Sequence, residues 1–142
     1  MKRVKDLLAQ KGSTIWSIAP EESVFEAVKL MAEKRIGVLM VLEEGELCGV
    51  VSERDYARRV VLLDRGSKTT MVREIMTDRV VFVEPEQTIQ DCMSLMTEKH
   101  FRHLPVMDEG TLIGVLSMTD LVRAQLADQQ YVISQLENYI NQ

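Results

Sequence analysis

The chain has few of the residues that mark specialised protein classes. Of its 142 residues, two are cysteines and three are prolines, and aromatic residues make up 5%. Cys48 and Cys92 show neither a CxxC spacing nor a Cys/His spacing that suits zinc, so we predict no metal site and two buried thiols. No apolar run approaches the ~20 residues that cross a bilayer, and the start lacks a signal-peptide core. We therefore expect a cytoplasmic protein with no membrane contact.

Basic residues are also in the minority. Lys and Arg number 17 against 22 Asp and Glu, which gives a net charge of −5. An acidic chain without a basic helix is a poor candidate for binding nucleic acid. No nucleophile and base, and no pair of carboxylates, stand in a pattern typical of catalysis, so we expect no enzyme activity and no catalytic cofactor.

What the sequence does contain is an internal repeat. GVVSERD at 49–55 returns as GVLSMTD at 114–120, and the offset of 65 (114 − 49) aligns 20–59 with 85–124 without a gap. Upstream, VKDLL resembles VREIM if the first copy carries three extra residues near positions 10–12. Two copies are too few for a solenoid, so we expect each to bury its apolar face against the other.

Each copy predicts a short leading strand followed by a helix, two strands and a second helix. Ser23-x-x-Glu26 and Thr88-x-x-Asp91 are capping-box patterns that begin the first helices. Glu-Gly pairs mark the turns of two hairpins. The predicted elements are leading strands at 13–18 and 79–83, hairpin strands at 38–42, 47–51, 103–107 and 112–116, and second helices at 56–63 and 121–126.

These elements give an α+β fold with four parts. We predict a first repeat at 1–63, a polar connector at 64–71, a second repeat at 72–126 and a C-terminal amphipathic helix at 127–142. The apolar stripe of that last helix fits either a contact with a second copy or packing within the chain, and the sequence leaves both open.

The repeated phrase has two interpretations. Ser52 with Asp55, and Ser117 with Asp120, can simply be capping boxes between a strand and a helix. The same groups can also bind a ribose phosphate, because a helix N-terminus suits phosphate and a carboxylate accepts hydrogen bonds from a sugar diol. In that interpretation, the glycines let the ligand approach the backbone closely.

Gly, two aliphatics, Ser, two variable residues and Asp, duplicated within one chain, resemble the CBS domain pair, or Bateman module, of the stand-alone bacterial type. The resemblance covers residues 4 to about 126. It implies tandem repeats packed as a pseudo-twofold pair, usually a homodimer, that bind AMP, ADP, ATP or NAD in two clefts between the repeats. Such modules are regulatory sensors and not catalysts.

Carrying the family's roles across by position gives two candidate clefts. By resemblance, the first is formed by Ser52, Arg54, Asp55, Val80, Val81, Arg102, His103 and Pro105. The second is formed by Ile15, Trp16, Val38, Met40, Ser117, Thr119 and Asp120.

The two clefts differ in charge. Arg102 and His103 align with Gly37 and Val38, and Arg54 aligns with Thr119. Because cations strengthen contacts to phosphate, we hypothesise that the Asp55 cleft binds the more phosphorylated ligand, while the Asp120 cleft is weaker, prefers a less charged ligand or stays empty.

Two functions follow from these observations. The first is a nucleotide sensor that signals through an unknown effector protein or through its own dimer. The alternative is a protein-interaction or dimerisation scaffold that binds no ligand, since the capping interpretation accounts for both phrases.

Overall fold

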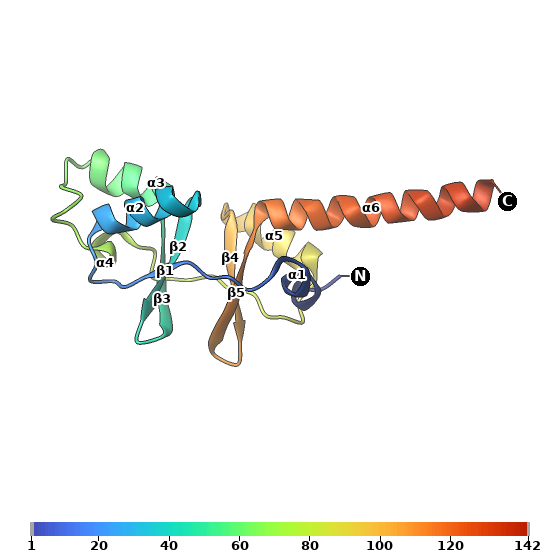
Figure 1. Cartoon of the computed structure of the whole chain (residues 1–142), viewed down its shortest axis with the longest axis horizontal. Coiled ribbons are helices and arrows are strands. Elements are labelled where there is room, and N and C mark those ends of the chain that lie inside the picture. Colours follow the sequence, from blue (N-terminus) through green and yellow to red (C-terminus); the bar gives the residue numbers. More distant parts are fainter. Residues whose placement is uncertain (1, 142) are drawn as a thin grey trace. The chain divides into compact units, whose positions relative to one another are not determined.

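The computed structural model of the protein describes residues 2–141 (Figure 1), which form two compact units. The first unit is Ile15–Val81. The second unit joins the N-terminal segment, through Thr14, to the chain from Phe82 onward. No helix in the described part of the chain is long and apolar enough to cross a membrane.

The first unit is a three-stranded sheet with helices packed against it. Strand β2 lies between β1, to which it is parallel, and β3, to which it is antiparallel. The unit's core includes Leu39, Val41, Val51 and Met31, all 2% exposed or less. Its elements are β1 (Ser17–Ile18), α2 (Val24–Lys34), β2 (Val38–Glu43), β3 (Glu46–Ser52), α3 (Glu53–Tyr56), the π-helix η1 (Ala57–Val61) and α4 (Val72–Ile75).

The second unit is an antiparallel hairpin flanked by three helices. Residue Val83 forms a single parallel bridge with Val106 beside the hairpin. Leu104, Leu116 and Leu121 are fully buried. The elements are α1 (Val4–Lys11), α5 (Ile89–Lys99), β4 (His103–Asp108), β5 (Thr111–Ser117) and α6 (Met118–Ile140).

The sequence repeat is confirmed as a structural repeat. The first helices and both hairpin strands begin and end 65 residues apart, and the two hairpins share their burial patterns. Each hairpin has a register shift at the same place, after Val41 and after Val106. Each predicted turn is present, with positive φ at Glu44-Gly45 and Glu109-Gly110, a conformation that glycine adopts without strain.

The segment before each repeat packs on the other repeat. In the second unit, the N–H of Val4 donates to the carbonyl of Gln87 at 2.9 Å. In the first unit, the N–H of Val72 donates to the carbonyl of Glu22, also at 2.9 Å. The two donors are 68 residues apart and the acceptors 65, so the three extra residues inferred from the sequence are confirmed. The compact units and the sequence repeats therefore have different boundaries, because the segment through Thr14 belongs to the unit of the second repeat.

Several predicted elements differ from those observed. Only Ser17–Ile18 of the 13–18 strand is formed, and the 79–83 segment contributes the Val83 bridge alone. The helix expected at 56–63 begins at Glu53 and changes to a π-helix at Ala57. The helices expected at 121–126 and 127–142 are one continuous helix, because nothing in that sequence caps or breaks it. Cys92 is buried as predicted, whereas Cys48 is only partly buried.

Candidate functional site

The first corner, Gly49–Asp55, lies where β3 meets α3, and its Ser and Asp form a capping box. The N–H of Ser52 donates to Oδ2 of Asp55 at 2.9 Å, and the N–H of Asp55 donates to Oγ of Ser52 at 3.2 Å. The hydroxyl of Ser52 also donates to Oδ2 of Asp55, at 3.0 Å. Within the chain, Ser52 and Asp55 therefore form the capping box that the first interpretation predicts. All these bonds use Oδ2, and within residues 2–141 no hydrogen bond reaches Oδ1.

The second corner, Gly114–Asp120, repeats this arrangement where β5 meets α6. The N–H of Ser117 donates to Oδ2 of Asp120 at 2.8 Å, and the N–H of Asp120 donates to Oγ of Ser117 at 3.1 Å. An additional cation is present here. The amine of Lys11, at the end of α1, donates to Oδ2 of Asp120 at 2.5 Å and to the carbonyl of Val115 at 2.8 Å.

Lys11 reaches this corner because of the three extra residues in the first copy. In the first unit, the N–H and carbonyl of Val50 pair with Thr77, just after the four-residue helix α4. Val115 is the equivalent of Val50, at the offset of 65. Helix α1 has eight residues and continues past that point, so the Lys11 amine takes the place of the backbone N–H that would donate to the carbonyl of Val115. The sequence signal for this contact was the insertion itself.

The environment of Asp120 favours its ionised form. Burial of the carboxyl opposes ionisation, but the hydrogen bonds from Lys11 and Ser117 outweigh it and hold the pKa of Asp120 below its ordinary value. His103 lies opposite Ser117 on the neighbouring strand. Burial lowers the pKa of His103 below its ordinary value, and although Asp120 acts in the other direction, Lys11 and Arg102 reinforce the effect of burial.

The repeated glycines face the chain's own side chains. A Cβ on Gly49 would lie 2.6 Å from Sδ of Met76 and 3.0 Å from the carbonyl oxygen of Thr77. A Cβ on Gly114 would lie 2.7 Å from Cδ2 of Leu8. On the side where a Cβ would project, both glycines therefore make room for the segment that precedes the other repeat.

The residues of each predicted cleft are divided between the two units, so the two clefts stay predictions. The first unit holds Ser52, Arg54, Asp55, Val80 and Val81 of the first cleft and Ile15, Trp16, Val38 and Met40 of the second. The second unit holds Arg102, His103 and Pro105 of the first cleft and Ser117, Thr119 and Asp120 of the second.

Exposure distinguishes these residues further. Arg54, Arg102 and Thr119 are exposed, whereas Met40 and Pro105 are buried. Trp16 is 39% exposed, so it is not a core residue, and the amine of Lys34 lies 4.4 Å from its ring centroid. Such a contact is a cation–π interaction, which leaves the indole with one face already engaged.

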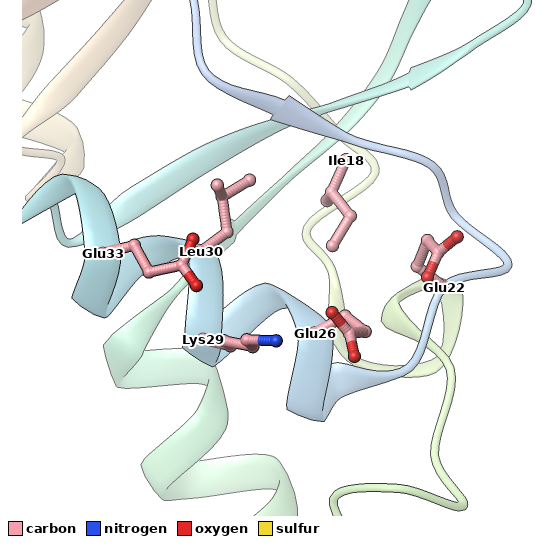
Figure 2. Close-up of a pocket in the computed structure, with 6 residues that line it drawn as sticks. All are labelled: Ile18, Glu22, Glu26, Lys29, Leu30 and Glu33. Atoms are coloured by element: carbon pink, nitrogen blue, oxygen red, sulfur yellow. The ribbon is translucent and has the colours of Figure 1, made fainter.

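A separate hollow of about 250 Å³ lies between α2 and β1 in the first unit (Figure 2). None of the predicted site residues lines it. Three carboxylates and one amine border the hollow, so its charge disfavours a phosphorylated ligand. Its lining residues are Ile18, Glu22, Glu26, Lys29, Leu30 and Glu33.

Known proteins share both the sequence and the fold. The CBS domain family model matches residues 4–62 and 72–127. The mitochondrial CBS domain-containing protein CBSX3 of Arabidopsis thaliana is 35% identical over 147 residues, which cover 96% of this chain and 71% of that protein. The CBS domain-containing protein YhcV of Bacillus subtilis (strain 168) is 30% identical over 129 residues, which cover 91% and 89%.

Solved structures agree with this assignment. A protein with CBS domains from Burkholderia ambifaria MC40-6 is 50% identical, with a TM-score of 0.87 over 90% of this chain and 96% of that one. The CBS domain pair of protein MJ0100, solved with 5′-methylthioadenosine and S-adenosyl-L-methionine, shares the fold at 22% identity, with a TM-score of 0.79 over 90% of this chain and 98% of that one. The resemblance inferred from the repeated phrase is confirmed, and the chain belongs to the CBS domain family as a tandem pair of α+β repeats.

Proposed function

We propose that the protein is a regulatory module that binds an adenine nucleotide, AMP, ADP, ATP or NAD, in clefts formed with residues of both repeats. It acts in the cytoplasm as a sensor and not as an enzyme, and it passes the signal to an effector protein or through its own homodimer. The ligand is bound and released unchanged, without a catalytic cofactor.

One observation carries the proposal. Asp55 and Asp120 each use only Oδ2 for the cap, so Oδ1 has no hydrogen bond within the described residues. A carboxylate oxygen in this state accepts a hydrogen bond from a ribose hydroxyl without breaking the cap. The complex of MJ0100 with two adenosine compounds supports this ligand class, because that protein shares the fold.

Calorimetric titration of AMP, ATP, NAD and S-adenosylmethionine into the wild-type chain tests the proposal. We expect at least one ligand to bind, and Asp55→Ala or Asp120→Ala to weaken it at least tenfold. Asp91→Ala is the matched control: Asp91 closes an equivalent capping box with Thr88 at the start of α5, outside the two corners. The proposal fails if no ligand binds, or if Asp91→Ala weakens binding as much as the corner variants do.

The same titrations test the hypothesis that the two clefts differ. We expect Asp55→Ala to lose more affinity for ATP than for AMP, since Arg54, Arg102 and His103 supply cations to that cleft by resemblance. Lys11 now adds a cation beside Asp120 that the alignment of the two copies does not reveal. Equal losses for the two variants with every ligand would contradict the hypothesis.

A ligand-free scaffold is the second candidate. Both corners complete their caps with the chain's own groups, and α6 carries exposed apolar side chains such as Leu136 and Tyr139. Thermal denaturation with each nucleotide separates the two functions, because a ligand that binds the native state raises the melting temperature. A scaffold would show no rise with any of them.

A further inference from the structure

Helix α6 is longer than its packing within the second unit requires. Its 23 residues span about 34 Å at a rise of ~1.5 Å per residue. Figure 1 shows it running past α5, against which its first turns pack. Leu121 and Ala124 are its buried residues, and from Gln125 to Asn141 no residue is buried. A helix that leaves this much apolar surface in water is typical of one that pairs with another surface.

The exposed part has the spacing of a coiled coil. Alternate steps of four and three residues lead from Val122 to Ile140, which is the a and d pattern of a heptad repeat. We call these positions the α6 seam: Val122, Leu126, Gln129, Ile133, Leu136 and Ile140. The exposed fractions of its apolar members range from 40% at Val122 to 77% at Ile140. Val132 and Tyr139 extend the seam on one side and are 54% and 78% exposed.

We propose that two copies of the chain pair through the α6 seam as a parallel two-stranded coiled coil. This deepens the homodimer of the proposed function by naming its surface, and it does not depend on nucleotide binding. The seam is self-complementary, and four of the six positions beside it are uncharged, Gln125, Gln130, Val132 and Tyr139, with Arg123 and Glu137 the exceptions. The exposed seam and its flanking side chains amount to on the order of 700 Å² per chain, close to the ~800 Å² per partner of a stable interface.

Gln129 selects the parallel orientation. In a parallel pair in register, Gln129 of one copy lies beside Gln129 of the second copy, and the two amides can hydrogen-bond to each other. In an antiparallel pair it lies against an aliphatic side chain, which leaves a buried amide without a partner. A single polar residue in an apolar seam is a known determinant of coiled-coil register.

Sedimentation equilibrium without nucleotide tests the pairing. We expect Leu136→Asp to halve the mass of the wild-type assembly. Tyr131→Asp, on the opposite face of α6 and 67% exposed in the wild type, should leave the mass unchanged. Circular dichroism and the melting curve of each variant serve to check that both units stay folded. A wild-type monomer at every concentration overturns this inference and the proposed homodimer together, whereas a Leu136→Asp variant that keeps the wild-type mass overturns this inference alone.

Disulfide crosslinking tests the orientation. In a background with Cys48→Ser and Cys92→Ala, Gln129→Cys should crosslink two chains on mild oxidation. Tyr131→Cys in the same background is the control and should remain uncrosslinked. If Gln129→Cys fails to crosslink while Leu136→Asp still separates the chains, the parallel arrangement is wrong.

Discussion

Removing the amine of Lys11 should destabilise the second unit. Replacement by methionine keeps most of the aliphatic stem and removes both hydrogen bonds, to Asp120 and to the carbonyl of Val115. The side chains of the ion pair are 34% and 17% exposed, so water screens the charges in part. Exposed pairs contribute about 0.2–1 kcal/mol. Because a half-buried carbonyl also loses its donor, we expect Lys11→Met to lower the free energy of unfolding by about 1 kcal/mol at neutral pH.

This loss should depend on pH. Burial opposes the ionisation of Asp120, but the bonds from Lys11 and Ser117 lower the pKa of its carboxyl below the unfolded value of ~3.9. For a depressed pKa, the stabilisation is complete above the unfolded value and is lost as the pH falls through the folded one. The difference in stability between wild type and Lys11→Met should therefore be constant from pH 7 to about pH 5 and shrink below about pH 4.

Urea and thermal denaturation between pH 3 and pH 7 measure both effects, with an expected fall in melting temperature of about 2–4 °C per kcal/mol for a chain of this size. Lys5→Met is the control, because Lys5 pairs with Glu86 at 3.2 Å where the two side chains are 52% and 71% exposed, and we expect little change. In a double-mutant cycle, Lys11→Met should cost less in an Asp120→Asn background. Equal costs in the two backgrounds, or a cost that does not vary with pH, would refute the reasoning.

Three further predictions concern the glycines, the cap and the thiols. Gly49→Ala should cost about 1–3 kcal/mol in urea denaturation, and Gly114→Ala less, because only the former methyl meets a backbone carbonyl, at 3.0 Å. Ser117→Ala should lower the stability by about 1 kcal/mol through loss of its cap, seen as a lower urea midpoint. Cys48 should react with a thiol reagent well before Cys92, because Cys92 is buried and burial raises its pKa to about 11; equal rates would contradict this.

The fold could be predicted to the level of the repeat because its signals are local. Turn residues at Glu44-Gly45 and Glu109-Gly110, and caps at Ser23 and Thr88, each act within a few residues of the chain. The offset of 65 then carries the assignments of the first helix and of both hairpin strands from one copy to the other. Where local signals were weak, at the leading strands, the predicted length was wrong, since a two-residue strand such as Ser17–Ile18 has no periodicity to detect.

The contacts between distant segments could not be predicted in the same way. The similarity of VKDLL to VREIM indicates that the two segments are equivalent, but not that each packs on the repeat it does not precede. The contact of Lys11 with Asp120 spans 109 residues, and the approach of Leu8 to Gly114 spans 106 (114 − 8). Such contacts form because each leading segment packs on the repeat that it does not precede, and no periodic pattern in the sequence indicates this packing. The π-helix after Tyr56 is also without a signal in the sequence.

The segment that packs on each corner explains why the two corners differ in charge. The backbone N–H bonds of the two capping boxes agree to within a few tenths of an ångström, and the additional bond from the Ser52 hydroxyl to Asp55 adds no charge to the first corner. The difference in charge comes from the segment that packs on each corner. Thr77 bonds to the backbone of β3 through neutral groups, whereas Lys11 adds a charge at Asp120. The greater length of α1 compared with α4 therefore alters the charge at the second corner, although the seven residues of that corner keep the repeated pattern. Comparison of the two motifs by themselves misses this, and the segments that pack on them have to be compared as well.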